Sequence, residues 1–207
     1  RCPAPTVGQI NGAQDFNATE LDRIDVTNAG NFDWAQDANA TITFWMKSDM
    51  APEGNRAMIG RDNAQGIIWY IGVDGGDTNP GNIRVAVAND KNNPGNIAVD
   101  SGTDSNVTDG VWHHIAVVLT QFEIEVYVDG AFDFNISRVA TTDLNVSGAD
   151  VHFGSLSNAS AEVPYNGSLD DIALYNVALS ASDINASYNS IVSPPTDPTD
   201  PTDPTDL

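Results

Sequence analysis

Residues 109–130, DGVWHHIAVVLTQFEIEVYVDG, constrain the fold more than any other part of the chain. Residues 112–119 are almost continuously apolar after two histidines, which is typical of a strand covered on both faces. Residues 123–128 alternate between polar and apolar, which is typical of a strand with one face in solvent. The pair Asp129-Gly130 favours a two-residue hairpin into residues 131–137. The segment therefore predicts three consecutive antiparallel strands.

Short segments with the composition of strands recur along the rest of the chain, separated by turns rich in Asn, Asp and Gly. Further strands are predicted at residues 23–26, 40–48, 56–62, 67–73, 150–157 and 168–176. The sequence NPGNI occurs at residues 79–83 and again at 93–97, and Pro-Gly favours a type II turn that leads into a strand.

One helix is predicted near the C-terminus. Ser180 is a suitable N-cap, and Asp183 follows three residues later, as in a capping box. We therefore expect an all-β protein, an antiparallel β-sandwich with a short C-terminal helix.

The last 15 residues have a different composition. Residues 193–207 repeat Pro-Thr-Asp and carry no core-forming side chain before Leu207, which predicts an extended linker. We expect the sandwich to occupy residues 1–192, and the linker to join it covalently to further domains of a longer parent chain.

The charge of the chain is strongly negative. The 207 residues include 29 acidic and 8 basic ones, and the formal net charge is −21. This balance argues against nucleic acid and anionic membranes as partners and favours cations. No apolar run is long enough to span a membrane, so we expect no membrane insertion.

The chain contains a single cysteine, Cys2, so an internal disulfide is excluded.

Three segments together resemble the laminin-G-like domains of the concanavalin A-like superfamily. They are DGVWHHIA with the later YVDG, ATITFWMKS at residues 40–48, and GSLDDIALYN with LSASDINASY at residues 167–188. The resemblance covers roughly residues 11–190 and implies a jelly-roll sandwich. Because one fold hosts many functions, it says much less about activity.

The resemblance also implies a structural calcium site. In relatives, a Phe-Asp-Gly turn and a following Asp near the N-terminus meet an Asp of the closing strand around the ion. Carried over by position, the ligands are Asn17, Asp22 and Asp170. Asn17 and Ala18 depart from the family's Asp and Gly, although an amide oxygen still ligates calcium. The alternative, in which these side chains only cap turns, stays open.

We expect no enzyme activity. The glucanases of this fold carry a strand motif E-x-D-x-x-E, which is absent here; Glu123 and Glu125 come nearest and are expected on a solvated face. His113 and His114 are neighbours in a strand and face opposite ways, so they cannot easily share a metal ion.

A ligand surface is predicted on one outer sheet face. Tyr70 and Arg84 are expected on the non-core faces of two neighbouring strands, and the acidic turn with Asp74 and Asp77 is expected at a strand end. Stacking rings and planar polar groups are typical of sugar sites. Packing or solvation of these side chains is the alternative.

The sequence therefore predicts a non-catalytic, calcium-stabilised recognition module that binds a glycan or another cell-surface ligand. It would belong to a secreted or cell-surface, adhesin-like bacterial protein and act outside the cell. Two alternatives remain. One is the carbohydrate-binding module of a secreted polysaccharide-degrading enzyme, and the other is a protein-interaction or spacer domain without a sugar site.

Overall fold

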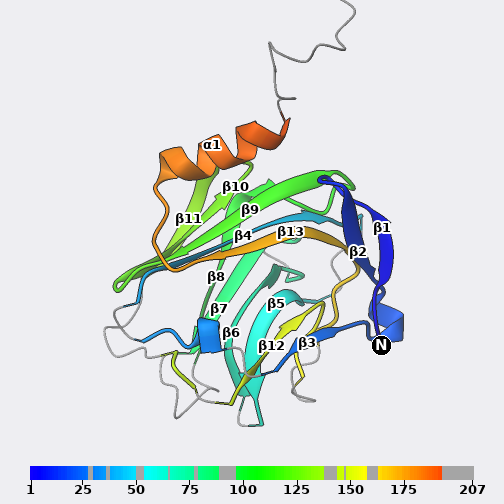
Figure 1. Ribbon diagram of the computed structural model, residues 1–207, viewed down its shortest axis with the longest axis horizontal. Coiled ribbons are helices and arrows are strands. Elements are labelled where there is room, and N and C mark those ends of the chain that lie inside the picture. Colours follow the sequence, from blue (N-terminus) through cyan, green and yellow to red (C-terminus); the bar gives the residue numbers. More distant parts are fainter. Residues whose placement is uncertain are drawn as a thin grey trace, which may run out of the picture.

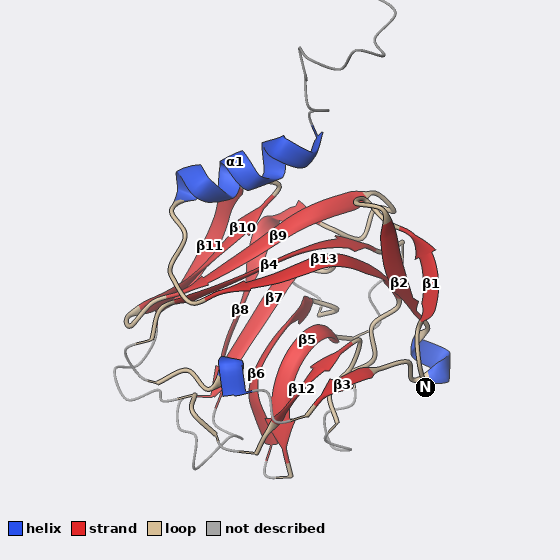
Figure 2. Ribbon diagram, in the orientation of Figure 1, coloured by secondary structure: helices blue, strands red, loops and turns tan. Residues whose placement is uncertain are grey.

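The chain forms a two-layered β-sandwich with one helix on its outside (Figures 1 and 2). The computed structural model describes residues 1–27, 30–35, 38–49, 54–64, 66–76, 79–88, 97–137, 144–146, 148–157 and 163–192. Within these residues both sheets are antiparallel, which confirms the predicted all-β sandwich. The predicted linker, residues 193–207, lies outside the described residues.

The first sheet has seven strands in the order β1-β2-β13-β4-β9-β10-β11. Their bounds are β1 Ala4–Val7, β2 Gly12–Phe16, β13 Gly167–Tyr175, β4 Ala40–Lys47, β9 Trp112–Leu119, β10 Glu123–Val128 and β11 Ala131–Ser137. The hairpin β1–β2 stands at one edge of this sheet, close to the N-terminus (Figure 1).

The second sheet has six strands in the order β3-β12-β5-β6-β7-β8. Their bounds are β3 Ile24–Val26, β12 Asp150–Phe153, β5 Arg56–Asn63, β6 Gly66–Val73, β7 Asn82–Ala88 and β8 Ile97–Asn106. Two short 3-10 helices, η1 Ala18–Glu20 and η2 Gly30–Phe32, interrupt the loops, and the helix α1 spans Ala181–Val192.

The three consecutive strands predicted at residues 112–137 are confirmed as β9, β10 and β11. At the second turn, Asp129 and Gly130 have φ of 50° and 77°, so both adopt the positive φ that the hairpin requires. The continuous apolar pattern of β9 also has its expected cause. Ile115 and Val117 face the second sheet, whereas Ala116 and Val118 face α1.

One predicted strand is shorter in the structure. The strand expected at residues 150–157 ends at Phe153, because Gly154 has φ of 88° and a side chain there would meet the ring of Phe16. The first NPGNI copy forms its turn with Gly81 at φ 87°. The second copy lies mostly in residues 89–96, outside the described part of the chain.

The predicted capping box of α1 is confirmed. Asp183 N donates to Ser180 Oγ at 3.2 Å, and Ser180 N donates to Asp183 Oδ2 at 3.1 Å. The helix packs on the outer face of the seven-stranded sheet through Ile184, and the Tyr188 ring stacks on Trp45 at 5.8 Å between centroids. No helix among the described residues is both long and apolar enough to cross a bilayer.

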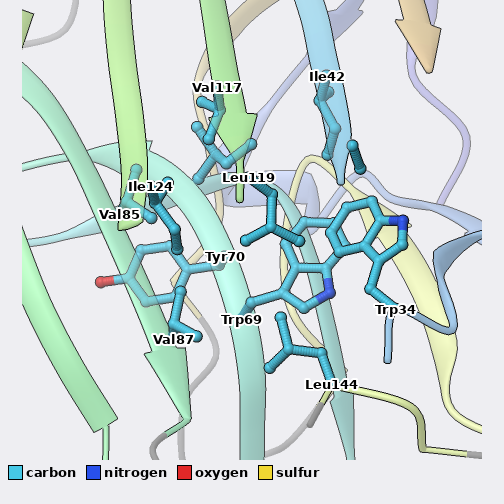
Figure 3. A pocket seen from close by; sticks show the side chains of 12 residues that line it. Trp34, Ile42, Trp69, Tyr70, Val85, Val87, Val117, Leu119, Ile124 and Leu144 are labelled. Carbon is cyan, nitrogen blue, oxygen red and sulfur yellow. The ribbon is translucent and has the colours of Figure 1, made fainter. Parts of the chain in front are cut away.

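The core lies between the two sheets and includes a cluster of aromatic rings. Trp34 and Trp69 stack there at 5.3 Å between ring centroids, beside a cavity of about 20 Å³ (Figure 3). Apolar side chains line the cavity, so it offers an entering polar ligand few partners. We therefore assign this cavity to packing and not to ligand binding.

One buried charge connects the core to the loops. The Arg61 side chain on β5 is 1% exposed and donates to the carbonyl oxygens of Phe32, Val146 and Ala149. Its guanidinium also forms an ion pair with Asp33. Arg61 thus holds the loop residues Phe32, Asp33, Val146 and Ala149 against one end of the sandwich.

Candidate functional site

Four side chains form a row across the outer face of the seven-stranded sheet. Asp15 of β2 pairs with Ser168 of β13, Ser168 pairs with Lys47 of β4, and Lys47 pairs with Trp112 of β9. Directly paired residues project from the same face of a sheet. The next residue along β4, Met46, belongs to the core, so the row must face outward.

This row lines a polar cleft of about 300 Å³. The remaining lining residues are Thr6, Val7, Ser48, Asp49, Asn166 and Gly167. The volume is at the lower end of the range for ligand pockets. In contrast to the cavity in the core, carboxylate, hydroxyl, amide and ammonium groups surround it together with one indole.

Hydrogen bonds fix the walls of the cleft. Ser168 Oγ donates to Asp15 Oδ1 at 2.9 Å, and Ser48 Oγ donates to the Asn166 carbonyl oxygen at 2.7 Å. The hydroxyl of the buried Tyr165 donates to the Lys47 carbonyl oxygen at 3.0 Å. The backbone on both sides of the cleft is therefore held before any ligand arrives, which lowers the entropic cost of binding.

The ammonium group of Lys47 has no carboxylate partner in the described part of the chain. Ion pairs within 4.0 Å are formed instead by Arg1, Arg23, Arg61 and Arg84. Lys47 is exposed and Trp112 is half-buried, so both can be reached from solvent. The cleft thus offers a cation, an aromatic ring and hydrogen-bond acceptors side by side.

Three of the four ligand residues predicted from the sequence come together, but on the other sheet. Arg84 Nε donates to the Tyr70 hydroxyl at 2.9 Å, and Arg84 Nη1 lies 3.6 Å from Asp74 Oδ1. Asp77 lies outside the described residues.

The Tyr70 ring is not available as a stacking surface. It is 4% exposed and packs with Ala57, Ala86 and Leu156 on the outer face of the six-stranded sheet. Burial raises the pKa of its hydroxyl, although the neighbouring Arg84 opposes this effect. Only Arg84, half-buried, presents part of this cluster to a ligand. Alternation along β6 could not reveal this, because the covering segment follows β12, far away in the sequence.

Two of the predicted calcium ligands lie in one loop. Asp22 Oδ2 accepts a hydrogen bond from Asn17 N at 3.1 Å, and Asn17 Oδ1 accepts one from Thr19 N at 2.9 Å. Asp22 is buried, and its second oxygen, Oδ1, has no hydrogen-bond partner among the described residues. That oxygen is the one group in this loop that a cation would satisfy.

The third predicted ligand lies elsewhere, which corrects the predicted geometry. Asp170 Oδ2 accepts from Ile10 N at 2.7 Å, so Asp170 caps the turn between β1 and β2. Ile10 precedes β2 and Asn17 follows it, and a five-residue strand is about 17 Å long. Asn17, Asp22 and Asp170 therefore cannot share one ion. The described residues contain no group of three His, Cys, Asp or Glu side chains suited to a metal.

A different residue of the closing segment reaches the Asn17 loop. Asn166 Oδ1 accepts a hydrogen bond from Ala18 N at 3.3 Å, and Asn166 also lines the polar cleft. The calcium loop inferred from the resemblance thus adjoins the cleft through Asn166.

The two histidines of β9 occupy separate environments, as their alternation predicts. His113 Nδ1 lies 2.8 Å from Asp129 Oδ2 and Nε2 lies 3.1 Å from Asp109 Oδ1; the hydrogen bond to Asp129 raises the pKa of His113 against the opposing effect of burial. His114 packs beside Trp45 and Tyr188, and burial lowers its pKa.

Glu123 and Glu125 serve local contacts on β10. Glu123 accepts from Asn135 Nδ2 at 2.8 Å, and Glu125 accepts from the Tyr127 hydroxyl at 2.7 Å. The hydrogen bonds account for both side chains as part of the sheet surface.

The sequence reasoning missed the row of Asp15, Lys47, Trp112 and Ser168. Each residue occupies an outward position in its own strand, and this could be inferred from alternation. Their convergence depends on the strand order β2-β13-β4-β9 and on its register, which local patterns do not contain.

Comparisons with known structures find the same fold in binding domains. The binding domain of Paraclostridial Mosquitocidal Protein 1 aligns with 92% of this chain and 47% of its own, at a TM-score of 0.71 and 18% identity. The Botulinum neurotoxin serotype G binding domain aligns with 90% of this chain and 46% of its own length, at a TM-score of 0.64 and 15% sequence identity. This chain therefore spans about half the length of these toxin domains.

A third similar structure is the heptameric SAP-like pentraxin from Limulus polyphemus. It covers 80% of this chain and 74% of its own, at a TM-score of 0.59 and 14% identity. At such low identity the likeness establishes the fold alone. A comparison with curated protein sequences found no significant match.

A family model described as "Concanavalin A-like lectin/glucanases superfamily" matches residues 17–185, which is most of the chain. The match agrees with the two-sheet architecture and confirms the resemblance seen in the sequence. The protein belongs to the concanavalin A-like lectin/glucanase superfamily.

Proposed function

We propose that this chain is a non-catalytic recognition module that binds carbohydrate in the polar cleft of the seven-stranded sheet. The observation that carries the proposal is the row of Asp15, Ser168, Lys47 and Trp112 inside a cleft of about 300 Å³. Sugar rings have apolar faces and polar edges, so a site for them needs an aromatic surface beside hydrogen-bonding groups.

The spacing of the row suits a short oligosaccharide. Neighbouring strands lie about 4.8 Å apart, so the four residues span about 14 Å from Asp15 to Trp112. The Trp112 indole would stack on one ring, while Asp15 and Ser168 would accept and donate hydrogen bonds to hydroxyl groups further along. A ligand lying across the strands would contact all four side chains at once.

The proposed absence of catalysis has two supports. The strand motif of the glucanases in this superfamily, E-x-D-x-x-E, is missing from the sequence, and two of the similar structures described above are binding domains of toxins. Glycoside hydrolysis requires a pair of carboxylates placed on either side of the bond that is cleaved. We expect the isolated chain to release no reducing ends from polysaccharides.

We also propose that calcium supports the loop beside the cleft, with Asp22 as its carboxylate ligand. The buried Oδ1 of Asp22, which lacks a partner among the described residues, favours a cation at this position. Asp170 is left out because it caps another turn. Affinity rises with the number of charged ligands, so a single carboxylate implies weak binding, near the millimolar values of extracellular modules.

A secreted or cell-surface parent protein, such as a bacterial adhesin, fits this proposal. Among proteins of similar fold, cell entry of botulinum neurotoxin type C depends on interaction with two ganglioside molecules. The binding domain of the DC neurotoxin is known in complex with rat synaptotagmin II, so the same fold also serves protein recognition. A parent enzyme that degrades polysaccharides remains the second candidate setting.

A glycan array probed with the full chain tests the proposed function. We expect binding to a defined set of glycans, loss of that binding in Trp112→Ala, and no loss in the matched control Val111→Ala, whose exposed side chain is outside the cleft lining. Melting temperatures of both variants control for unfolding. Binding that survives Trp112→Ala in a folded protein would move the site elsewhere.

A further inference from the structure

Lys47 is an unusual cation for this protein. The formal net charge is −21, yet no carboxylate lies within 4.0 Å of its ammonium group in the described residues. The four arginines with described ion pairs use their charge to hold parts of the chain together, as Arg61 does with Asp33. Lys47 makes no such contact, so its charge is available to a ligand.

The fold directs this side chain into the cleft. Lys47 ends β4, and its Cα is paired with Ser168 on one side and Trp112 on the other. Its flanking residues, Met46 and Ser48, are buried, and its carbonyl oxygen accepts from the Tyr165 hydroxyl. The backbone therefore fixes the direction in which the lysine leaves the sheet.

The neighbouring outward position on β4 is already covered. Trp45, two residues earlier, is 1% exposed and lies under Tyr188 of α1. Lys47 is thus the outward residue of β4 at which the helix no longer covers the sheet. An ammonium group at this place meets whatever enters the cleft.

The cleft contains both hydrogen-bond acceptors and a charged hydrogen-bond donor. Asp15 is an acceptor for hydroxyl groups, and its Oδ1 already accepts from Ser168 Oγ. Lys47 is a donor with a full positive charge, and it stands next to the Trp112 indole in the register. A sugar ring stacked on Trp112 would therefore present one edge to the ammonium group.

We propose that the cleft selects glycans with an anionic group, which Lys47 binds as its counter-ion while Trp112 stacks on the sugar ring. This inference rests on the proposed carbohydrate-binding function and adds the chemical class of the ligand. A charge-assisted hydrogen bond from an ammonium group is about twice as strong as a neutral one, and it needs an oxygen at about 2.8 Å. A carboxylate and a sulfate both supply such an oxygen.

The test uses an array of glycan pairs that differ by a single carboxylate or a single sulfate, probed with the full chain. We expect the anionic member of a bound pair to bind about tenfold more tightly. Lys47→Met should weaken binding of the anionic member to the level of its neutral partner and so remove the preference, whereas Lys47→Arg should retain it. Arg84→Met, on the other sheet, should behave as the unchanged protein does.

The outcomes separate this inference from the function on which it rests. Neutral glycans that bind as tightly as their anionic partners in a Trp112-dependent manner would overturn the selectivity alone. A preference that persists in Lys47→Met would do the same. Absence of all glycan binding, or binding indifferent to Trp112→Ala, would contradict both proposals. A preference confined to carboxylate pairs or to sulfate pairs identifies which anion the ligand carries.

Discussion

Replacing Arg61 with Met tests the account of how the sandwich holds its loops. Methionine is similar in length and fills the space, but it removes the charge and every hydrogen bond. The Arg61 side chain is 1% exposed, so the charge and the hydrogen bonds that the variant removes are buried. The carbonyl oxygens of Phe32, Val146 and Ala149 would lose the hydrogen bond from Arg61, and Asp33 would lose its ion pair.

The expected loss follows from these contacts. Removing one partner of a buried ion pair costs about 3 to 5 kcal/mol. The lower part of this range applies here, since Asp33 is 27% exposed and can be hydrated once its partner is gone. We therefore expect Arg61→Met to lower the free energy of unfolding by roughly 3 kcal/mol. For about 200 residues this corresponds to a fall of about 6 to 12 °C in melting temperature.

Urea unfolding and calorimetry measure this loss. Arg23→Met is the matched control, because the Arg23 and Asp25 side chains are 28% and 43% exposed and an ion pair near the surface contributes about 0 to 1 kcal/mol. If Arg61→Met unfolds at the same urea concentration as Arg23→Met, the loops do not depend on Arg61 and the reasoning is wrong.

Three further predictions concern protons, calcium and the helix. Burial would lower the pKa of His152, but the carboxylates of Asp62 and Asp25 outweigh burial and raise this pKa. The stability that His152 contributes is therefore fully present below about pH 6.5, and it is lost as the pH rises through the pKa of the folded state. The urea concentration at the unfolding midpoint should therefore decrease as the pH rises from about 6 to about 8. His152→Gln should flatten this pH dependence, and an equally steep decrease in that variant would contradict the reasoning. At 10 mM calcium and a dissociation constant of about 1 mM, the melting temperature should rise by about 3 to 6 °C. Asp22→Asn should abolish this rise and Asp170→Asn should not, whereas equal melts in EDTA and calcium would rule the ion out. Ser180→Ala should cost about 1 kcal/mol through loss of the α1 cap, measured by urea unfolding against Ser182→Ala, and an equal loss in both variants would show that the cap contributes little.

The architecture was accessible from the sequence because its signals are local. The apolar run of β9, the alternation of β10 and the Asp129-Gly130 turn each fix a strand or a turn within a few residues. The Ser180 and Asp183 pair did the same for the start of α1. Such features depend on backbone conformation and burial, which neighbouring residues largely determine.

The sites were less accessible because they depend on distant pairings. Tyr70 has an outward position in its strand, but Leu156, which comes 86 residues later, covers its ring. Asp170 matches the family's position for a calcium ligand, yet the turn at Ile10 uses its carboxylate. The cleft is a site without a sequence motif. Lys47 and Trp112 lie far apart in the sequence, and only the register of β4 and β9 places them side by side.

The tryptophans allow the most direct test of carbohydrate binding in the cleft. The protein has four, and Trp34, Trp45 and Trp69 are at most 7% exposed while Trp112 is half-buried in the cleft lining. Indole N–H resonances, followed by NMR while a glycan selected on the array is added, report on all four at once. We predict that the Trp112 resonance shifts with saturation and that the three buried indoles serve as unshifted references. Saturable binding that leaves the Trp112 resonance in place would contradict the assignment of the cleft as the sugar site.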